Sequence, residues 1–253
     1  MRSAMYVINK SLLLMAAITA SAQAVASDGT ELIAGGVLDS FRPVSGWHVV
    51  GDVAAVDGET RLVTGPLGNG DRPYLVNSLE KSRVPYLFTT ADYDDVEVSL
   101  EFMIPRGSNA GVYLMGRYEV QILDSFGKSE VTHGDLGGVY QRWRDKQAAI
   151  RAGLPQGYEG VAPLVNAAEP PGVWQAMRIR FRAPRFDASG TKIENAKFVT
   201  VHVNGRLVQR DVEVTGPTRA APRRGEASTG PIAIQGDHGP IAIRSFVVEP
   251  LVD

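Results

Sequence analysis

A carboxylate and an amide share one face of a segment in which polar and apolar residues alternate. In residues 118–124, Glu119 and Gln121 alternate with apolar side chains. A strand with this pattern turns its apolar side chains to the core and its polar side chains to the opposite face. There a carboxylate can take up a proton, bind a metal ion or hydrogen-bond to sugar hydroxyls. The alternative is an ordinary strand whose polar face only meets solvent.

A histidine lies in a glycine-rich turn near the end of the chain. The turn begins at Gln235 and has the sequence QGDHGP, so a glycine stands on each side of Asp237 and His238. Glycine leaves space around neighbouring side chains, and histidine is well suited to proton transfer near neutral pH. The turn therefore predicts a histidine that is presented to a site. A surface histidine without a role is the alternative.

A third group of chemically capable residues lies in residues 133–143. Aromatic rings there can stack on the apolar face of a sugar, and polar side chains can bind its hydroxyls. A loop that packs on the protein through its aromatic residues would have the same composition. The residues concerned are Asp135, Tyr140, Arg142 and Trp143.

The elements that must position these groups are strands, because polarity alternates with a period of two along much of the chain. The alternation is clearest in residues 96–104. Asn204-Gly205 between two alternating segments is typical of a tight β-hairpin. No segment predicts a long helix, so we expect an all-β sandwich of two antiparallel sheets. The other predicted strands are residues 111–115, 118–123, 175–181, 198–203, 232–235 and 241–248.

Residues 125–172 interrupt this regularity. They contain few alternating runs and many glycine and proline residues, and they read as a long loop insertion. Long insertions in compact domains are usually functional, so we expect this one to cover a concave binding face. A disordered linker is the alternative, but the aromatic residues of the segment disfavour it.

The N-terminus and the composition limit the protein's location and partners. Residues 1–26 have basic residues, a short apolar run and a small-residue ending, which are typical of a secretory signal peptide. We therefore expect a single domain at residues 27–253 that is exported to the periplasm and has no membrane span. The chain has 26 basic and 28 acidic residues and no cysteine. This balance gives no reason to expect nucleic acid as a partner, and a thiol nucleophile is excluded.

Four segments together resemble the bacterial 3-keto-disaccharide hydrolase family. They are GVYLMGRYEVQILDSFG at residues 111–127, GGVYQRW at 137–143, PPGVWQ at 170–175 and IAIQGDHGPIAIR at 232–244. The resemblance implies a jelly-roll sandwich similar to concanavalin-like lectins and glucanases. It also implies a sugar substrate. The family's usual opening motif is altered at residues 39–43.

The resemblance implies cleavage of glycosides that are already oxidised at C3, by hydrolysis or by elimination through an enolate at C2. Glu119 or His238 would be the base. Arg142, or a divalent metal ion held by Glu119 and His238, would stabilise the enolate. Asp124 and Asp135 are further catalytic candidates. The residues expected to bind the substrate are Gln121, Tyr140, Trp143, Gln235 and Asp237.

A non-catalytic carbohydrate-binding module with the same sandwich is the main alternative, because one fold can host both functions. Such a module would need aromatic and amide side chains but not the pair Glu119 and His238. A structural envelope protein is a third interpretation, and it predicts no affinity for sugars. The oligomeric state is not predicted by the sequence.

Overall fold

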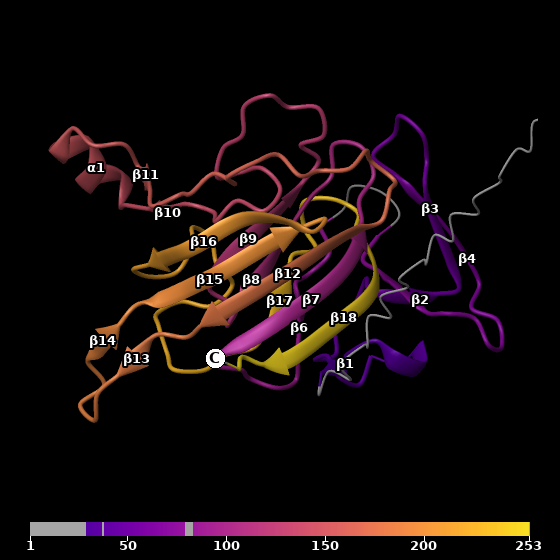
Figure 1. Ribbon diagram of the computed structural model, residues 1–253, viewed down its shortest axis with the longest axis horizontal. Coiled ribbons are helices and arrows are strands. Elements are labelled where there is room, and N and C mark those ends of the chain that lie inside the picture. Colours follow the sequence, from indigo (N-terminus) through magenta and orange to yellow (C-terminus); the bar gives the residue numbers. More distant parts are fainter. Residues whose placement is uncertain (1–28, 37, 79–82, 253) are drawn as a thin grey trace, which may run out of the picture.

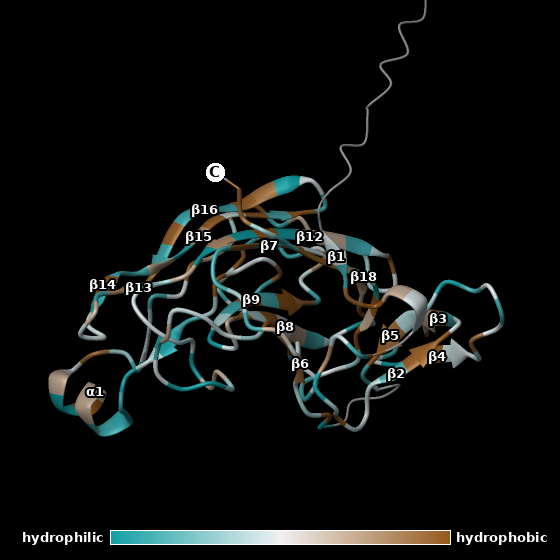
Figure 2. Ribbon diagram, turned by 90° about the horizontal axis from the view of Figure 1, so that it is seen from below, coloured by the Kyte–Doolittle hydropathy of each residue, from teal (hydrophilic) through white to brown (hydrophobic). Residues whose placement is uncertain are grey.

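Two antiparallel sheets, one large and one small, form the body of the protein. The computed structural model describes residues 29–36, 38–78 and 83–252. The signal peptide predicted at residues 1–26 lies outside the described residues. Figure 1 shows the large sheet in front and the small sheet behind it, and Figure 2 shows the same two layers from the edge.

The large sheet has eight strands, and its centre consists of long strands from distant parts of the sequence. β7 pairs with β12 on one side and with β18 on the other, and β12 pairs with β15; all three pairs are antiparallel. The order is β16 (Arg206–Val214), β15 (Ala196–Val203), β12 (Gln175–Arg182), β7 (Val96–Met103), β18 (Ala242–Pro250), β5 (Tyr74–Val76) and β2 (His48–Val50), with β1 (Thr30–Glu31) paired to β18.

The small sheet has four strands, and it carries the residues discussed below. Its order is β6 (Leu87–Phe88), β17 (Ala233–Ile234), β8 (Asn109–Leu114) and β9 (Tyr118–Leu123). Three two-stranded pairs lie outside the sheets. They are β3 (Asp52–Ala55) with β4 (Leu62–Gly65), β10 (Arg142–Trp143) with β11 (Gly157–Tyr158), and β13 (Arg185–Phe186) with β14 (Lys192–Glu194). The helical elements are η1 (Ala34–Gly36) and α1 (Lys146–Ala152).

The main hydrophobic core lies between the two sheets. Alternate residues of β7 and β12 meet alternate residues of β8 and β9, and the meeting side chains are almost fully buried. Because burying each such side chain contributes about 1.5–3 kcal/mol, this layer fixes the register of every strand in it. The core side of β9 is Tyr118, Val120 and Ile122. Glu119 and Gln121 must therefore point away from the core.

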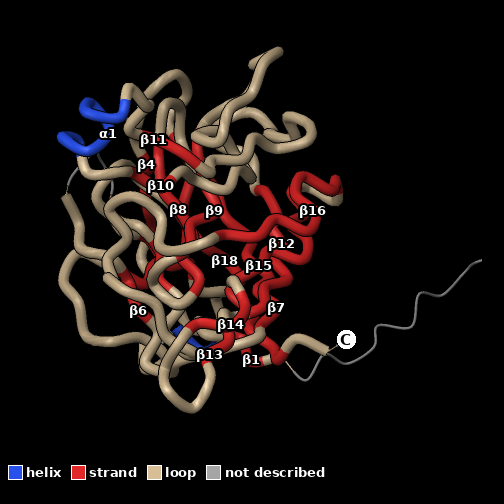
Figure 3. Tube along the Cα trace, turned by 90° about the vertical axis from the view of Figure 1, so that its left-hand side faces the viewer, coloured by secondary structure: helices blue, strands red, loops and turns tan. Residues whose placement is uncertain are grey.

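Residues 125–172 continue the small sheet before they leave it. The backbone N–H groups of Gln121 and Gly137 bond to the carbonyls of Gly138 and Gln121, each at 2.9 Å, and Val139 bridges to Val120. The segment then projects as β10, α1 and β11 at one end of the molecule. Figure 3 shows α1 at the upper left of that view, beside β10 and β11. The start of the insertion is thus held beside β9 by backbone hydrogen bonds.

The predicted all-β fold with antiparallel sheets is confirmed, and the seven predicted strands correspond to β7, β8, β9, β12, β15, β17 and β18. The insertion differs in detail from a plain loop, because it contains α1. Asp145 caps this helix by accepting a hydrogen bond from the backbone N–H of Ala148 at 2.9 Å. Among the described residues, no helix is long and apolar enough to cross a membrane.

The hairpin between β15 and β16 gives a test of the fold. Asn204 and Gly205 both have positive φ angles, 50° and 75°. A side chain at the second position is strained in this conformation, so Gly205→Ala should lower the free energy of unfolding by about 1 kcal/mol. Gly134→Ala is the control, because φ is ordinary there and the added carbon would meet no atom closer than 3.6 Å. Equal urea midpoints for the two variants would contradict the prediction.

Candidate active site

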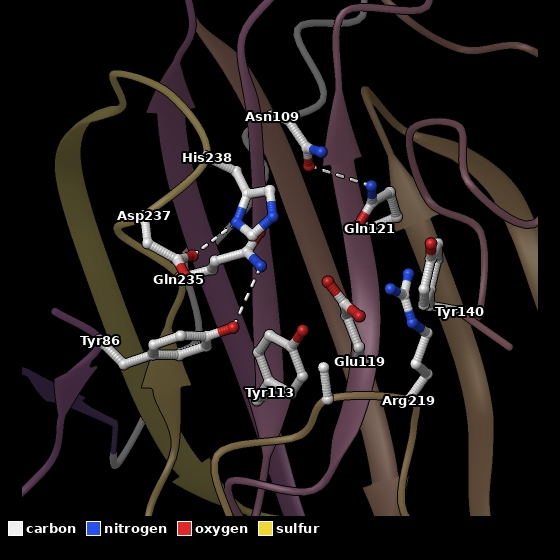
Figure 4. Close-up of a pocket in the computed structure, with 11 residues that line it drawn as sticks. Tyr86, Asn109, Tyr113, Glu119, Gln121, Tyr140, Arg219, Gln235, Asp237 and His238 are labelled. Carbon is white, nitrogen blue, oxygen red and sulfur yellow. Dashed lines mark hydrogen bonds and ion pairs between the residues drawn. The ribbon is translucent and has the colours of Figure 1, made fainter. Parts of the chain in front are cut away.

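A cavity of about 230 Å³ opens on the face of the small sheet that points away from the core. β8 and β9 form its floor, the loop after β17 forms one wall, and residues from the insertion and the segment before β17 form the other (Figure 4). The sequence-predicted residues that line it are Glu119, Gln121, Tyr140, Gln235, Asp237 and His238. Four further lining residues with polar side chains are Tyr86, Asn109, Tyr113 and Arg219.

The alternation of β8 and β9 places Glu119 at the bottom of this cavity. Tyr113 pairs with Glu119 across the two strands, and Gly111 pairs with Gln121. A carbon atom added to Gly111 would lie only 2.4 Å from Oε1 of Glu119. The carboxyl group therefore lies over Gly111, and only glycine leaves room for it there.

The backbone N–H and carbonyl of Glu119 bond to two segments that lie beside the strand. Its N–H donates to Oγ1 of Thr218 at 3.1 Å, and its carbonyl accepts from the N–H of Tyr140 at 3.1 Å. The segments that carry Thr218 and Tyr140 thus cover the strand from the side. Glu119 is only 3% exposed, although its strand face could have met solvent.

Burial changes the acidity of this carboxyl group. It raises the pKa of Glu119 to about 8, because the charged form loses its hydration. A hydrogen bond from Tyr113 and the charge of Arg219 lower the pKa, and the charge of Asp237 raises it, but burial has the largest effect. At neutral pH the carboxyl group is therefore mostly protonated.

Two tyrosines connect the glutamate to the opposite wall. The rings of Tyr86 and Tyr113 lie edge to face with their centroids 5.5 Å apart. Burial is the main cause that raises the pKa of both hydroxyls, so both stay protonated and can donate. The side chain of Tyr113 hydrogen-bonds to Glu119 and to Tyr86. Nε2 of Gln235 donates to the Tyr86 hydroxyl at 3.1 Å and so extends this series to the opposite wall.

Two buried amides stand on either side of Gly111. The backbone N–H of Gln235 bonds to the carbonyl of Gly111 at 2.9 Å, and Gln121 is the cross-strand partner of Gly111 on the other side. Nε2 of Gln121 donates to Oδ1 of Asn109 at 3.1 Å. Oε1 of Gln121 and Oε1 of Gln235 have no hydrogen-bond partner in the described structure. Since a buried acceptor without a partner is costly, these amides are suited to binding a hydroxylated ligand.

The Asp-His pair predicted from the glycine-rich turn forms a hydrogen bond. Nδ1 of His238 lies 2.6 Å from Oδ1 of Asp237. Both side chains are partly exposed, at 52% and 34%, and they form the rim of the cavity. With Nδ1 bound to the carboxylate, Nε2 of His238 is the nitrogen left to accept a proton. Gly236 has backbone carbonyls of Pro85 and Val84 within 2.8 Å of where a side chain would begin, so the turn is held close to the protein.

The cation in the cavity is Arg219, a residue that the sequence did not point to. Its guanidinium carbon lies 3.6 Å above the centre of the Trp143 ring. Trp143 itself is 40% exposed and does not line the cavity. Arg142, the cation suggested by the family resemblance, lies elsewhere: its Nη1 bonds to Glu159 and Thr215.

The two aspartates suggested as further catalytic candidates also lie outside the cavity. Oδ2 of Asp124 accepts a hydrogen bond from the N–H of Gly107 at 2.8 Å and so holds the turn before β8. Asp135 is 2% exposed and bonds to Lys128 and Thr132. Burial raises the pKa of Asp135, but these hydrogen bonds outweigh it and the net pKa is lowered. Both carboxylates have local structural partners.

Glu119 and His238, the predicted ligands of a divalent metal ion, line the same cavity. The described part of the chain contains no group of three or more His, Asp or Glu side chains that could hold a metal. The mechanism is derived from side chains alone. The divalent ion stays a prediction from the sequence, and treatment with a chelator tests it.

Some of the missed residues had a signal in the sequence. Tyr113 lies inside the predicted strand 111–115 and alternates with Gly111, and extending that strand by two residues places Asn109 on the same side of the sheet, which Glu119 also occupies. Tyr86 lies two residues before Phe88 of β6, and the two rings stack on the same side of the chain. Arg219 lies in a segment without any strand pattern, and no local signal indicates it.

The acidity of Glu119 predicts a pH dependence of stability. Between pH 4.5 and about 8 the folded protein keeps a proton that the unfolded chain releases, so stability from this group is fully present at low pH and is lost as the pH rises through about 8. Glu119→Gln should remove a slope of at most about 1.4 kcal/mol per pH unit in this range. Urea unfolding at a series of pH values measures it. The exposed Glu213→Gln is the control, and an unchanged slope in Glu119→Gln would refute the assignment.

The sequence model of one protein family matches most of the chain. It is the model for the 3-keto-alpha-glucoside-1,2-lyase-like domain, and the match covers residues 29–249. A comparison with curated protein sequences finds no match.

Two crystal structures from Parabacteroides distasonis ATCC 8503, each described as a "putative glycosyl hydrolase", share the fold. One is 23% identical with a TM-score of 0.57, and the match covers 89% of this chain and 84% of that one. The other is 17% identical with a TM-score of 0.54, and the match covers 89% of this chain and all of that one. At these identities the likeness concerns the fold alone.

Proposed function

Because the chain belongs to the 3-keto-alpha-glucoside-1,2-lyase-like domain family, a carbohydrate-active family, we propose that its pocket cleaves glycosides that carry a ketone at C3. One observation carries the proposal. A buried carboxyl group that is protonated at neutral pH, Glu119, lies in the same small pocket as a carboxylate-bound histidine, His238. Titratable groups whose environments differ in this way can divide the roles of acid and base.

The chemistry requires both roles. A ketone at C3 makes the hydrogen on C2 acidic, so a base can remove that proton and leave an enolate. The enolate then re-forms the C3 carbonyl, makes a double bond between C1 and C2, and breaks the bond from C1 to the glycosidic oxygen. An acid gives that oxygen a proton. Water that adds across the new double bond would complete hydrolysis, so elimination and hydrolysis share these steps.

In this scheme His238 is the base and Glu119 is the acid. Asp237 holds Nδ1 of His238 and stabilises the imidazolium that forms when Nε2 takes the C2 proton. Glu119 holds its proton at neutral pH and gives it to the leaving oxygen. Arg219 and the hydroxyls of Tyr86 and Tyr113 are the donors available to the enolate oxygen. Arg219 thus takes the role that the resemblance suggested for Arg142.

The amides and Tyr140 complete a site for a sugar ring. Gln121 and Gln235 offer side-chain carbonyl oxygens without protein partners, and Tyr140 adds an aromatic wall. The ring of Tyr140 packs edge to face with the ring of His133, with the centroids 5.4 Å apart. A pocket of this size accommodates one sugar ring, so the leaving group extends out of it.

Two variants separate the acid from the base. With 3-keto disaccharides, Glu119→Gln and His238→Asn should each lower kcat by about 10²- to 10⁴-fold. With a nitrophenyl 3-keto-glucoside, whose leaving group needs no proton, Glu119→Gln should retain most of its activity while His238→Asn remains slow. Only His238→Asn should stop exchange of the C2 hydrogen with deuterium from the solvent.

Two control variants and the pH dependence of kcat test the assignment further. Glu213→Gln and His48→Asn replace the same residue types at exposed positions outside the pocket, and both should keep wild-type kcat. For the disaccharide, kcat should fall as the pH rises through about 8, because Glu119 loses its proton. Wild-type protein that binds 3-keto sugars without cleaving them would replace the proposal by the carbohydrate-binding module.

A further inference from the structure

Trp143 does not line the pocket, but it stacks with an arginine that does. It lies in β10, where it pairs with Gly157, and its ring is covered on one face by the guanidinium group of Arg219 at 3.6 Å. An aromatic ring attracts a cation placed over its face at this distance. The covered face of Trp143 is therefore closed to a sugar, although its exposed position and ring type suggested stacking.

The backbone of Arg219 is tied to the same segment as its side chain. Its N–H donates to the carbonyl of Gln141 at 3.0 Å, two residues before Trp143. The next residue, Ala220, lines the pocket with a positive φ of 57°, a conformation that is uncommon outside glycine. One short stretch of the insertion thus holds Arg219 at both its backbone and its guanidinium group.

The guanidinium group of Arg219 is close enough to the pocket for its charge to act there. Within the described parts of the chain Arg219 makes no ion pair, and its charge acts on Glu119 inside the pocket. A guanidinium group has five N–H donors, and stacking on a ring leaves those at its edge free. Without the ring, a long flexible side chain at the pocket rim would sample many rotamers, because arginine loses much conformational entropy when it is fixed.

We propose that Trp143 is a positioning residue that holds Arg219 with its N–H groups toward the oxygen on C3 of the sugar. This inference rests on the proposed function, because it assigns Arg219 to the developing enolate. The insertion then contributes to catalysis through a cation that it holds in place, and Trp143 does not touch the substrate.

A double-mutant cycle tests this. Arg219→Ala should lower kcat by about 10²- to 10³-fold, as expected for loss of a donor to an oxyanion. Trp143→Leu should lower kcat by about 10-fold, and Trp143→Phe, which keeps an aromatic face, should recover part of it. In the Arg219→Ala background, Trp143→Leu should have no further effect. Tyr158→Leu is the matched control, because it removes the ring on which Arg144 stacks, at 4.0 Å, in the same projection outside the pocket.

Two other outcomes would overturn the proposal, and a third tests the proposed function separately. If the two substitutions are additive, Trp143 does not act through Arg219. A rise in KM on Trp143→Leu in the Arg219→Ala background would mean that the ring touches the sugar itself, which also overturns the proposal. If wild-type protein binds 3-keto sugars but never cleaves them, the proposed function fails on its own. The same cycle, measured on the dissociation constant, then still decides whether Trp143 acts through Arg219.

Discussion

The burial of one carboxyl group is the constraint on which the site depends. Glu119 lies on a strand whose other face is packed in the core, so its position cannot shift without moving Val120 and the register of the sheet. Its own face is closed by segments bonded to both of its backbone groups. The carboxyl group is consequently buried, and burial raises its pKa. An exposed carboxylate on the same strand would keep its hydration.

The space for that carboxyl group comes from a glycine. Gly111 lies next to Gln121 in the neighbouring strand, and any side chain there would overlap the carboxyl oxygen. In the interior of a strand glycine is unfavourable, because it has no side chain to pack and loses more backbone conformational entropy on folding than other residues do. At Gly111 the missing side chain leaves a depression in the floor of the pocket, with a buried amide on each side. Glycine at this position is thus what leaves room for the carboxyl group.

The sequence predicted seven of the strands and part of the pocket. Alternation reports which side chains leave the core together, and this placed Glu119 with Gln121. The glycines around His238 indicated a presented turn. Arg142 and Arg219 show where such reasoning ends. Both are arginines near aromatic residues. Which of them reaches the pocket depends on how the loop before β17 packs beside β10. Tertiary contacts fix that packing, such as the hydrogen bond from the N–H of Arg219 to the carbonyl of Gln141. No periodic pattern encodes such contacts.

The two sides of the pocket differ in burial, and this difference matches the roles proposed for them. An acid must hold its proton until the bond to the leaving group breaks, and burial of Glu119 favours the protonated form. A base must release its proton to solvent after each turnover, and His238 lies half exposed on a turn at the rim. If the roles were exchanged, the buried group would have to lose its proton at neutral pH against the cost of desolvation, and the exposed group would have to keep one in contact with water. The geometry therefore favours the assignment in which the strand holds the acid and the turn holds the base.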